Sequence, residues 1–253
     1  MMNLFLKRLT FVFIILLTAF PCARAEEEGE KKQKPYSSST SFSLLMTSGN
    51  AEDLTLGLDT EQNLNLDKNQ IQFKGNIIYS ENEGAKESEI YYSHLEYKRI
   101  LSSKAYLTGI GRWERNVLSG YNHRLSLSVG GGYLWMKSEK LEFSSEAAVG
   151  WSKENNVDKG KDNSISLSFA SLLISSKLKV RVSKTSEFAY HEIFFLNLDD
   201  SKDYRLSSLV SLSVAISGNL ALKMSYQLKY NHKPVPGFKN TDHYLLSSLI
   251  INF

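Results

Sequence analysis

Apolar and polar residues alternate along most of this chain, and that period of two limits the chain to folds built from β-strands. The stretch LTLGLDTEQNLNL places Leu54, Leu56, Leu58, Leu64 and Leu66 on one face, with acidic and amide side chains on the other. RLSLSVGGGYLW and LALKMSYQLKY repeat the pattern. Successive side chains of a strand point to opposite faces of a sheet. The alternation therefore predicts strands with one apolar and one polar face.

Twelve segments carry this alternation, and no proline interrupts them between Tyr36 and Lys233. Proline cannot donate a backbone hydrogen bond to a neighbouring strand, so its absence suits a continuous sheet. The predicted strands cover residues 38–48, 53–66, 70–81, 88–101, 104–116, 122–137, 140–153, 163–183, 187–198, 203–217, 220–231 and 242–253. The sequence thus predicts an all-β antiparallel fold of about 12 strands.

The eighth segment is the exception, because its apolar positions change parity near Ser175 and Ser176. Either a β-bulge or an extra turn explains such a change, and an extra turn would make the number of strands odd. The lengths of the connections favour the bulge, because they alternate along the whole chain.

Short connections (DKN, SSK, SEK, KTS and GN) follow the even-numbered segments. Longer polar connections (SGNAED, ENEGAKES, VLSGYN, ENNVDKGKD, DDSK and NHKPVPGFKN) follow the odd-numbered ones. Short turns on one rim and longer loops on the other are typical of transmembrane β-barrels of the outer membrane.

Three features indicate that the apolar face meets lipid. The segments reach the ~9 to 11 residues that a tilted strand needs to cross a bilayer. The polar face carries charges along its length, which a water-filled lumen tolerates and a packed core does not. Aromatic residues gather near the segment ends, as interfacial girdles do: Tyr79, Trp113, Trp151, Tyr204 and Tyr230 towards the long loops, and Tyr97, Trp135 and Phe253 towards the short turns.

The first 25 residues have the pattern of a secretory signal peptide, with Lys7 and Arg8 before an apolar run and Ala23-Arg24-Ala25 as the cleavage site. A membrane anchor would need ~20 apolar residues, and Phe20-Pro21 suits lipid modification of Cys22 poorly. We expect residues 1–25 to be removed, 26–37 to form a flexible periplasmic leader, and 38–253 to form the barrel.

Cleavage would leave 27 basic and 27 acidic residues and no cysteine. A neutral chain without a stripe of Lys and Arg gives no reason to expect a nucleic-acid partner. Without a thiol, disulfide bonds and cysteine-ligated metals are excluded.

The last segment, HYLLSSLIINF, ends on an aromatic residue. A closed barrel has no free edge, so its last strand must pair with its first. Leu249, Ile251 and Phe253 share one face and predict a C-terminal signal for the outer-membrane assembly machinery, although Ser247 departs from the apolar pattern.

Three stretches resemble the salt-induced outer-membrane proteins (YdiY-like), a family of unassigned function: SLLMTSGNAEDLTLGL, RWERNVLSGYNHRLSLSVGGGYLW and YQLKYNHKPVPGFKNTDHYLLSSLIINF. The resemblance spans nearly all of the chain after the signal peptide. It implies an outer-membrane barrel and supplies no catalytic residues. The reference to salt is treated as a label.

No catalytic, cofactor or metal site is predicted. None of the five histidines begins the H-x-S pair of outer-membrane phospholipases, and the acids of DDSKD are interpreted as solvated loop charge. His94 and Glu96 share a face and could form an acid/base pair, but a structural hydrogen bond is favoured. The run Gly130-Gly131-Gly132 lacks the spacing of a phosphate loop and predicts a close backbone approach or a bend.

Combining face with strand direction places five charged residues at similar height near the outer mouth of the lumen: Arg112, Glu114, Arg124, Arg205 and Lys229. Four positive charges against one negative would attract anions, unless the charges pair across strands and plug the barrel.

The sequence therefore predicts a narrow solute channel or a structural component of the outer membrane of a Gram-negative-type bacterium. The alternative is a closed barrel that binds a ligand, a lipid or a surface partner. The expected surroundings are outer-membrane lipids and lipopolysaccharide, with the assembly machinery as a transient partner and no cofactor.

Overall fold

The structure is a computed structural model that describes residues 35–48, 53–82, 85–157 and 165–253. One compact unit, Lys34–Phe253, contains all of the described strands. The predicted signal peptide lies outside the described residues, and so does most of the predicted leader.

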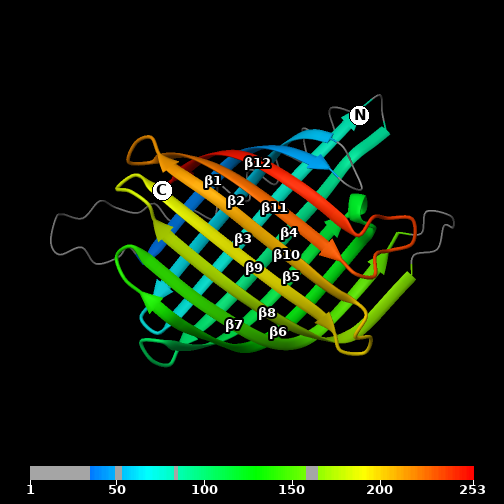
Figure 1. Ribbon diagram of the computed structural model, residues 1–253, viewed down its shortest axis with the longest axis horizontal. Helices are drawn as coiled ribbons and strands as arrows, with labels where there is room; N and C mark the ends of the chain where they lie inside the picture. Colours follow the sequence, from blue (N-terminus) through cyan, green and yellow to red (C-terminus); the bar gives the residue numbers. More distant parts are fainter. Residues whose placement is uncertain (1–34, 49–52, 83–84, 158–164) are drawn as a thin grey trace. The chain divides into compact units, whose positions relative to one another are not determined.

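Twelve antiparallel strands form a closed barrel in which each strand pairs with its neighbours in the chain (Figure 1). They are β1 (Tyr36–Ser48), β2 (Asp53–Leu66), β3 (Asn69–Asn82), β4 (Ala85–Ile100), β5 (Ala105–Asn116), β6 (Tyr121–Lys137), β7 (Leu141–Asn156), β8 (Ile165–Arg181), β9 (Ser186–Asn197), β10 (Tyr204–Ala215), β11 (Leu220–Asn231) and β12 (Thr241–Asn252). The only helical element among the described residues is a single 3-10 turn, η1 (Val117–Ser119). The predicted fold class and number of strands are confirmed.

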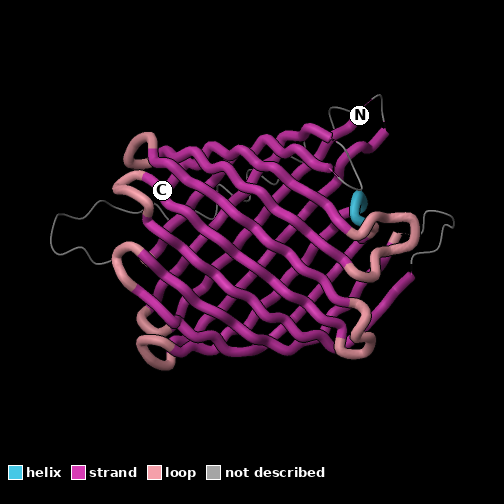
Figure 2. The backbone as a smooth tube through the Cα atoms, viewed as in Figure 1, coloured by secondary structure: helices cyan, strands magenta, loops and turns pink. Residues whose placement is uncertain are grey.

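The barrel closes where β12 pairs with β1, in a register that runs from Ser39 opposite Asn252 to Ser48 opposite His243. The backbone N–H of Phe253 extends this seam by donating to the carbonyl of Ser38 at 2.9 Å. The tilted strands cross one another in projection as a lattice (Figure 2). Closure leaves no strand edge to pair with another chain.

The predicted bulge in the eighth strand is wrong. β8 is one strand, and its pairings with β7 and β9 run without a shift in register. Its apolar positions change parity because Phe169 and Leu173 point into the barrel, where they are buried, while Ile174 points outward and is 43% exposed. Register shifts occur instead in the β3–β4, β5–β6 and β6–β7 pairings.

The two rims differ in the way that the connections predicted, with one exception. The turn after β2 contains only Asp67 and Lys68, and Asp67 adopts the left-handed region (φ 44°) that so tight a hairpin requires. The connection from β11 to β12, residues 232–240, is the longest between strands whose path is fully described. The exception is ENEGAKES, which was predicted as a loop but lies almost entirely in β3 and β4.

The outer face of the barrel is apolar. Large exposed side chains cover it, including Leu56 (75% exposed), Val129 (66%) and Leu127 (54%). Two tryptophans of the predicted girdles form hydrogen bonds with serines on neighbouring strands. Trp135 Nε1 donates to Ser145 Oγ and Trp151 Nε1 donates to Ser168 Oγ, both at 2.7 Å. The side chain of Tyr79 lies outside the described residues.

The inner face is mostly polar, but it also carries apolar side chains, some of which form a buried patch. Ser43, Ser152, Ser171 and Glu154 are almost completely buried inside the barrel. The patch consists of Leu45, Ile78, Ile90 and Tyr244, with Leu246 packed against it. Among the described residues, no helix has the length and hydropathy needed to cross a membrane.

Candidate functional site

A cavity of about 460 Å³ occupies the lumen. It is lined at the long-loop rim by Pro234, Lys239 and Asn240, and it extends down to Glu146 and Lys177 in the middle of the barrel. All five residues of the predicted charge ring line it: Arg112, Glu114, Arg124, Arg205 and Lys229. The lumen cavity is therefore the candidate functional site.

Four of the five ring residues join an ion-pair network in the upper lumen. Glu114 accepts from Lys229 Nζ at 3.4 Å and from Arg124 Nη1 at 3.3 Å. Its pair with Lys229 crosses the full lumen, because β5 and β11 lie six strands apart in the ring of twelve. Arg124 Nε lies 2.9 Å from Glu154 Oε1, and Arg205 binds the same carboxylate with both terminal nitrogens.

Two acids in this network were not predicted. Glu154 is 1% exposed and lies in β7, one residue beyond the end of the predicted strand. Asp203, which was interpreted as loop charge, lies 3.1 Å from Arg205 Nη2 and is also buried. Lys239 and Asp242 also line the cavity at this rim. With Glu154 and Asp203 the upper lumen therefore holds five cations against four carboxylates, so its positive charge is smaller than the sequence predicts.

Arg112 differs from the other three cations. Its Nε donates to His94 Nδ1 at 3.3 Å, which is its one hydrogen bond to a described residue. No carboxylate of the described residues forms an ion pair with it, whereas Arg124, Arg205 and Lys229 each have at least one such partner. Arg112 is thus a cation in the cavity wall that the fold does not neutralise by direct pairing.

A second network lies deeper in the barrel, around Glu96 and Glu146. Lys98 Nζ bridges the two carboxylates, at 3.3 Å from Glu96 and 2.7 Å from Glu146. Lys177 reaches the same pair from β8, at 3.8 and 3.5 Å. Four groups of alternating sign so close together bind one another strongly, because the lumen has a lower dielectric constant than water.

His94 belongs to the edge of this second network. Its Nε2 lies 3.7 Å from Glu96 Oε2, so the two residues that share a face in the sequence are also close in space. Glu96 is additionally held by Lys98 and by the hydroxyl of Thr108, which donates at 3.1 Å. These contacts fit the structural role that the sequence favoured for the pair.

The glycine run in β6 allows two close approaches. A Cβ at Gly130 would lie 2.1 Å from the carbonyl oxygen of Ala147 in β7. A Cβ at Gly132 would lie 2.2 Å from the ring of Tyr106, whose hydroxyl donates to Glu146 at 2.8 Å. The predicted close backbone approach is confirmed at Gly130, and Gly132 makes room for a side chain that supports the deeper network.

Two loops meet across the long-loop mouth. Gly120, at the end of the β5–β6 connection, has a φ of 89°, and a Cβ there would lie 2.9 Å from Val235 Cβ in the β11–β12 loop. Val235 is only 6% exposed. Ser119 Oγ also donates to Asp242 Oδ2 at 3.0 Å. Since these connections are on opposite sides of the ring, their contact spans the mouth; η1 and the loop lie side by side at this rim in Figures 1 and 2.

The β11–β12 loop is also tied to the neighbouring loop. Lys233 Nζ donates to Asp200 Oδ2 at 2.6 Å, and the His232 ring stacks on Tyr204 at 4.5 Å between centroids. The hydrogen bond from Lys233 lowers the pKa of the exposed Asp200 carboxyl and raises that of the Lys233 amine.

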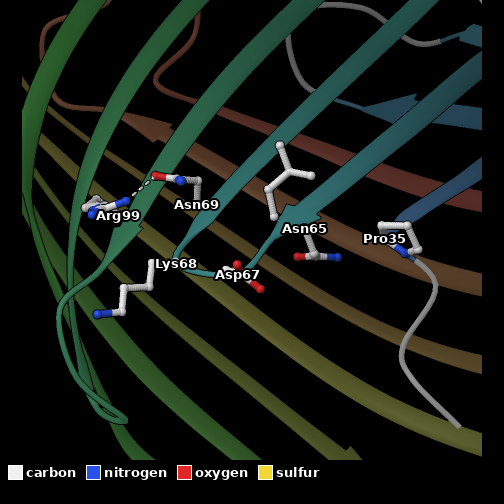
Figure 3. A pocket seen from close by; sticks show the side chains of 7 residues that line it. Pro35, Asn65, Asp67, Lys68, Asn69 and Arg99 are labelled. Atoms are coloured by element: carbon white, nitrogen blue, oxygen red, sulfur yellow. Dashed lines mark hydrogen bonds between the residues drawn. The ribbon is translucent and has the colours of Figure 1, made fainter. Parts of the chain in front are cut away.

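A second hollow lies on the other rim and is separate from the lumen cavity. Figure 3 shows Pro35 on one side of it and the β2–β3 turn, Asn69 and Arg99 on the other. Arg99 Nη1 donates to Asn69 Oδ1 at 2.9 Å there. The hollow is open to the surroundings and is lined by only three charged residues, Asp67, Lys68 and Arg99, so it is a weaker candidate site than the lumen cavity.

One charged residue faces the lipid side at mid-strand. In β9, His191, Ile193 and Phe195 line the cavity, so Glu192 between them points outward. The hydroxyl of Tyr190 donates to Glu192 Oε2 at 2.9 Å. This orientation was not predicted, because apolar residues occupy both faces of β9 and alternation therefore does not show which face points outward.

Among the described residues, no group of three or more His, Cys, Asp or Glu side chains could hold a metal ion.

The fold and the charge-lined lumen together define a β-barrel of the outer-membrane type. The chain belongs to the family described as "Protein of unknown function, DUF481", which matches residues 40–253. The salt-induced YdiY-like group is a narrower assignment and stays a prediction.

No curated protein matches the chain. Among solved structures, the NanC porin is similar with a TM-score of 0.58 and 9% identity, over 84% of this chain and 98% of the porin. The translocator domain of the autotransporter NalP from Neisseria meningitidis has a TM-score of 0.53 and 11% identity, over 88% and 90%. An outer membrane channel from Pseudomonas putida F1 has a TM-score of 0.51 and 9% identity, over 90% and 100%. At these identities the likeness shows the fold.

Proposed function

We propose that this protein is a narrow channel for small solutes in the outer membrane. The observation that carries the proposal is the lumen cavity of about 460 Å³, which is lined by charges and lies inside a barrel whose outer face is apolar. A charged lining favours contact with water and small ions, whereas an apolar outer face favours contact with lipid. A barrel of this size has a narrow bore compared with porins of 16 to 18 strands.

The proposal includes the setting in which the barrel works. The chain is exported by its signal peptide, is assembled by the outer-membrane machinery that reads Leu249, Ile251 and Phe253, and is surrounded by outer-membrane lipids and lipopolysaccharide. Leu249 and Phe253 are 38% and 63% exposed on the outer face, so both are available to such a reader.

The ring residues set the charge preference of the proposed channel. Five cations against four carboxylates in the upper lumen favour anions modestly. Arg124 and Arg205 pair with the buried Glu154, so replacing them would also leave the charge of that carboxylate uncompensated. Arg112 has no carboxylate partner among the described residues, so its charge is available to an anion in transit.

The second candidate function is a closed barrel that binds a ligand without passing it. The contact between Gly120 and Val235 favours this candidate, because it bridges the mouth. The ion pairs across the lumen favour it too, since they narrow the path below.

Conductance separates the two candidates. Purified, folded protein should insert into a planar lipid bilayer and give small, stepwise increases in current. In a salt gradient the reversal potential should show a preference for anions that weakens at high salt, where the screening length falls to ~3 Å at 1 M. Folded barrels that enter liposomes, as shown by flotation, but give no current in the bilayer would contradict the channel and support the closed barrel.

A further inference from the structure

Among the described residues that line the cavity, Arg112 is a cation without a carboxylate partner, and it is combined with apolar walls that a simple aqueous pore does not need. Arg112 Nε is held by His94 Nδ1, so the guanidinium is fixed by a neutral acceptor while its two terminal nitrogens have no hydrogen bond to a described residue. Because Nδ1 accepts, the proton of a neutral His94 lies on Nε2, towards Glu96. His94 thus orients the guanidinium without cancelling its charge.

The apolar part of the wall lies on several strands of the same cavity. Leu45, Ile78 and Ile90 line it together with Leu246 and the ring of Tyr244. On the other side of the lumen, β9 and β10 add Ile193, Phe195 and Leu209. Leu45, Ile78, Ile90 and Tyr244 are themselves only 1 to 6% exposed, so the apolar surface that faces the cavity comes mainly from the half-buried Leu246, Ile193, Phe195 and Leu209. Apolar surface that lines a water-filled space is costly, at roughly 25 cal/mol per Å², so it favours an occupant that covers it.

We propose that the cavity binds a small organic anion with an apolar body, such as an aliphatic or aromatic carboxylate, and that Arg112 holds its carboxylate. The inference rests on the proposed function, because it names the class of solute that occupies the same lumen. A guanidinium with two free terminal nitrogens matches the two oxygens of a carboxylate in a bidentate pair. The apolar walls then cover the rest of the molecule.

Other classes of solute fit less well. An inorganic anion would pair with Arg112 but would leave the apolar walls in contact with water. A neutral sugar would leave the guanidinium uncompensated, and an organic cation would be repelled by it. The volume of about 460 Å³ lies within the 300 to 1,000 Å³ typical of small-molecule pockets.

Binding is measured on the folded barrel in detergent at pH 7, as the shift of the thermal unfolding midpoint with increasing ligand. The probes are benzoate, acetate and benzyl alcohol, which separate the contributions of charge and apolar body in the unmodified protein. Benzoate should raise the midpoint at concentrations about tenfold lower than either of the other two. Equal effects of benzoate and acetate, equal effects of benzoate and benzyl alcohol, or no effect of benzoate would each overturn the proposal.

The variant Arg112→Gln tests which residue holds the carboxylate. It should weaken benzoate binding about tenfold or more, because a charge-assisted bidentate pair is lost. The matched control is Arg99→Gln, which removes an exposed arginine at the opposite rim and should bind benzoate as the parent does. Equal binding by Arg112→Gln and the parent would contradict the assignment of Arg112.

Failure of this inference differs from failure of the channel. Current steps without any effect of benzoate on the midpoint would leave the channel standing and remove the organic-anion site. A benzoate-dependent midpoint without current would keep the site and favour the closed, ligand-binding barrel.

Discussion

At the scale of single residues, four glutamates organise the lumen, because each of them pairs with two lysines or arginines: Glu96, Glu114, Glu146 and Glu154. Glu114 joins Arg124 and Lys229, and Glu154 joins Arg124 and Arg205. Removing one partner of a buried pair costs more than the pair contributes, since the remaining charges are left uncompensated. The acids therefore matter for stability as well as for any charge preference.

We predict that Glu154→Gln destabilises the barrel by about 3 kcal/mol, because Arg124 and Arg205 lose their common buried partner. The measurement is the free energy of unfolding in urea, with the protein folded into lipid vesicles. Glu142→Gln is the control in the same strand, since Glu142 is exposed and should have little effect. Equal stability of both variants would show that the network contributes nothing.

Glu192 belongs to the same scale but to the opposite face. A carboxylate near the middle of the membrane is unfavourable, by less than the ~2 to 4 kcal/mol of a lysine or arginine at that depth. We predict that Glu192→Leu increases the free energy of unfolding in lipid by about 1 kcal/mol. A decrease would mean that Glu192 stabilises the barrel, for example through its hydrogen bond with Tyr190, and would contradict the prediction.

At the scale of elements, the β11–β12 loop contacts the β5–β6 connection across the mouth of the lumen. Its Val235 is buried against Gly120, whereas the next residue, Pro236, is exposed. We predict that Val235→Asp releases the loop and increases single-channel conductance. Pro236→Asp adds the same charge at the exposed position and should leave conductance unchanged. If both variants conduct as the parent does, the contact between the loops does not limit passage.

The ion pair between Asp200 and Lys233 stabilises this loop only within a defined pH range. The pKa of Asp200 is below its ordinary 3.8, so its contribution is present above that value and is lost as the pH falls through the lowered pKa. The pKa of Lys233 is above 10.5, so its contribution is lost as the pH rises through the raised pKa.

We therefore expect the β11–β12 loop to resist limited proteolysis equally from about pH 5 to 9. Cleavage by an acid-stable protease should increase below pH 4 in the parent, and Lys233→Gln should show the increased cleavage across the whole range. An increase centred near pH 6 in the parent would contradict the role of Asp200.

At the scale of the whole molecule, the sequence predicts the architecture well, because alternation, rim asymmetry and closure are all local or periodic signals. Strand boundaries differ by only a few residues, and the predicted pairing of the last strand with the first is observed. Prediction from the sequence fails where the orientation or role of a residue depends on contacts between distant strands. The parity of β8 changes because Phe169 and Leu173 fill the lumen, and Glu154 is a ring member because Arg205, three strands away, reaches it.

The site shows the same division. Face and direction alone bring five charged residues to one cavity, but they do not reveal which of them are neutralised. Among the described residues, Arg112 has no carboxylate partner while Lys229 pairs with Glu114, and this difference follows from distances across the lumen. Glu192 was missed for another reason: in β9 apolar residues occupy both faces, so alternation gives no orientation.

The central claim is that the apolar face of this closed barrel meets lipid and the polar face lines the lumen, and cysteine scanning tests it most directly. Residues 26–253 contain no cysteine, so single cysteines at positions 125 to 129 of β6 can each carry an environment-sensitive fluorophore in lipid vesicles. We predict that lipid-attached quenchers reduce the fluorescence of probes at Leu125, Leu127 and Val129, and leave the fluorescence of probes at Ser126 and Ser128 unchanged. Quenching that is uniform along the strand, or strongest at the two serine positions, would contradict it.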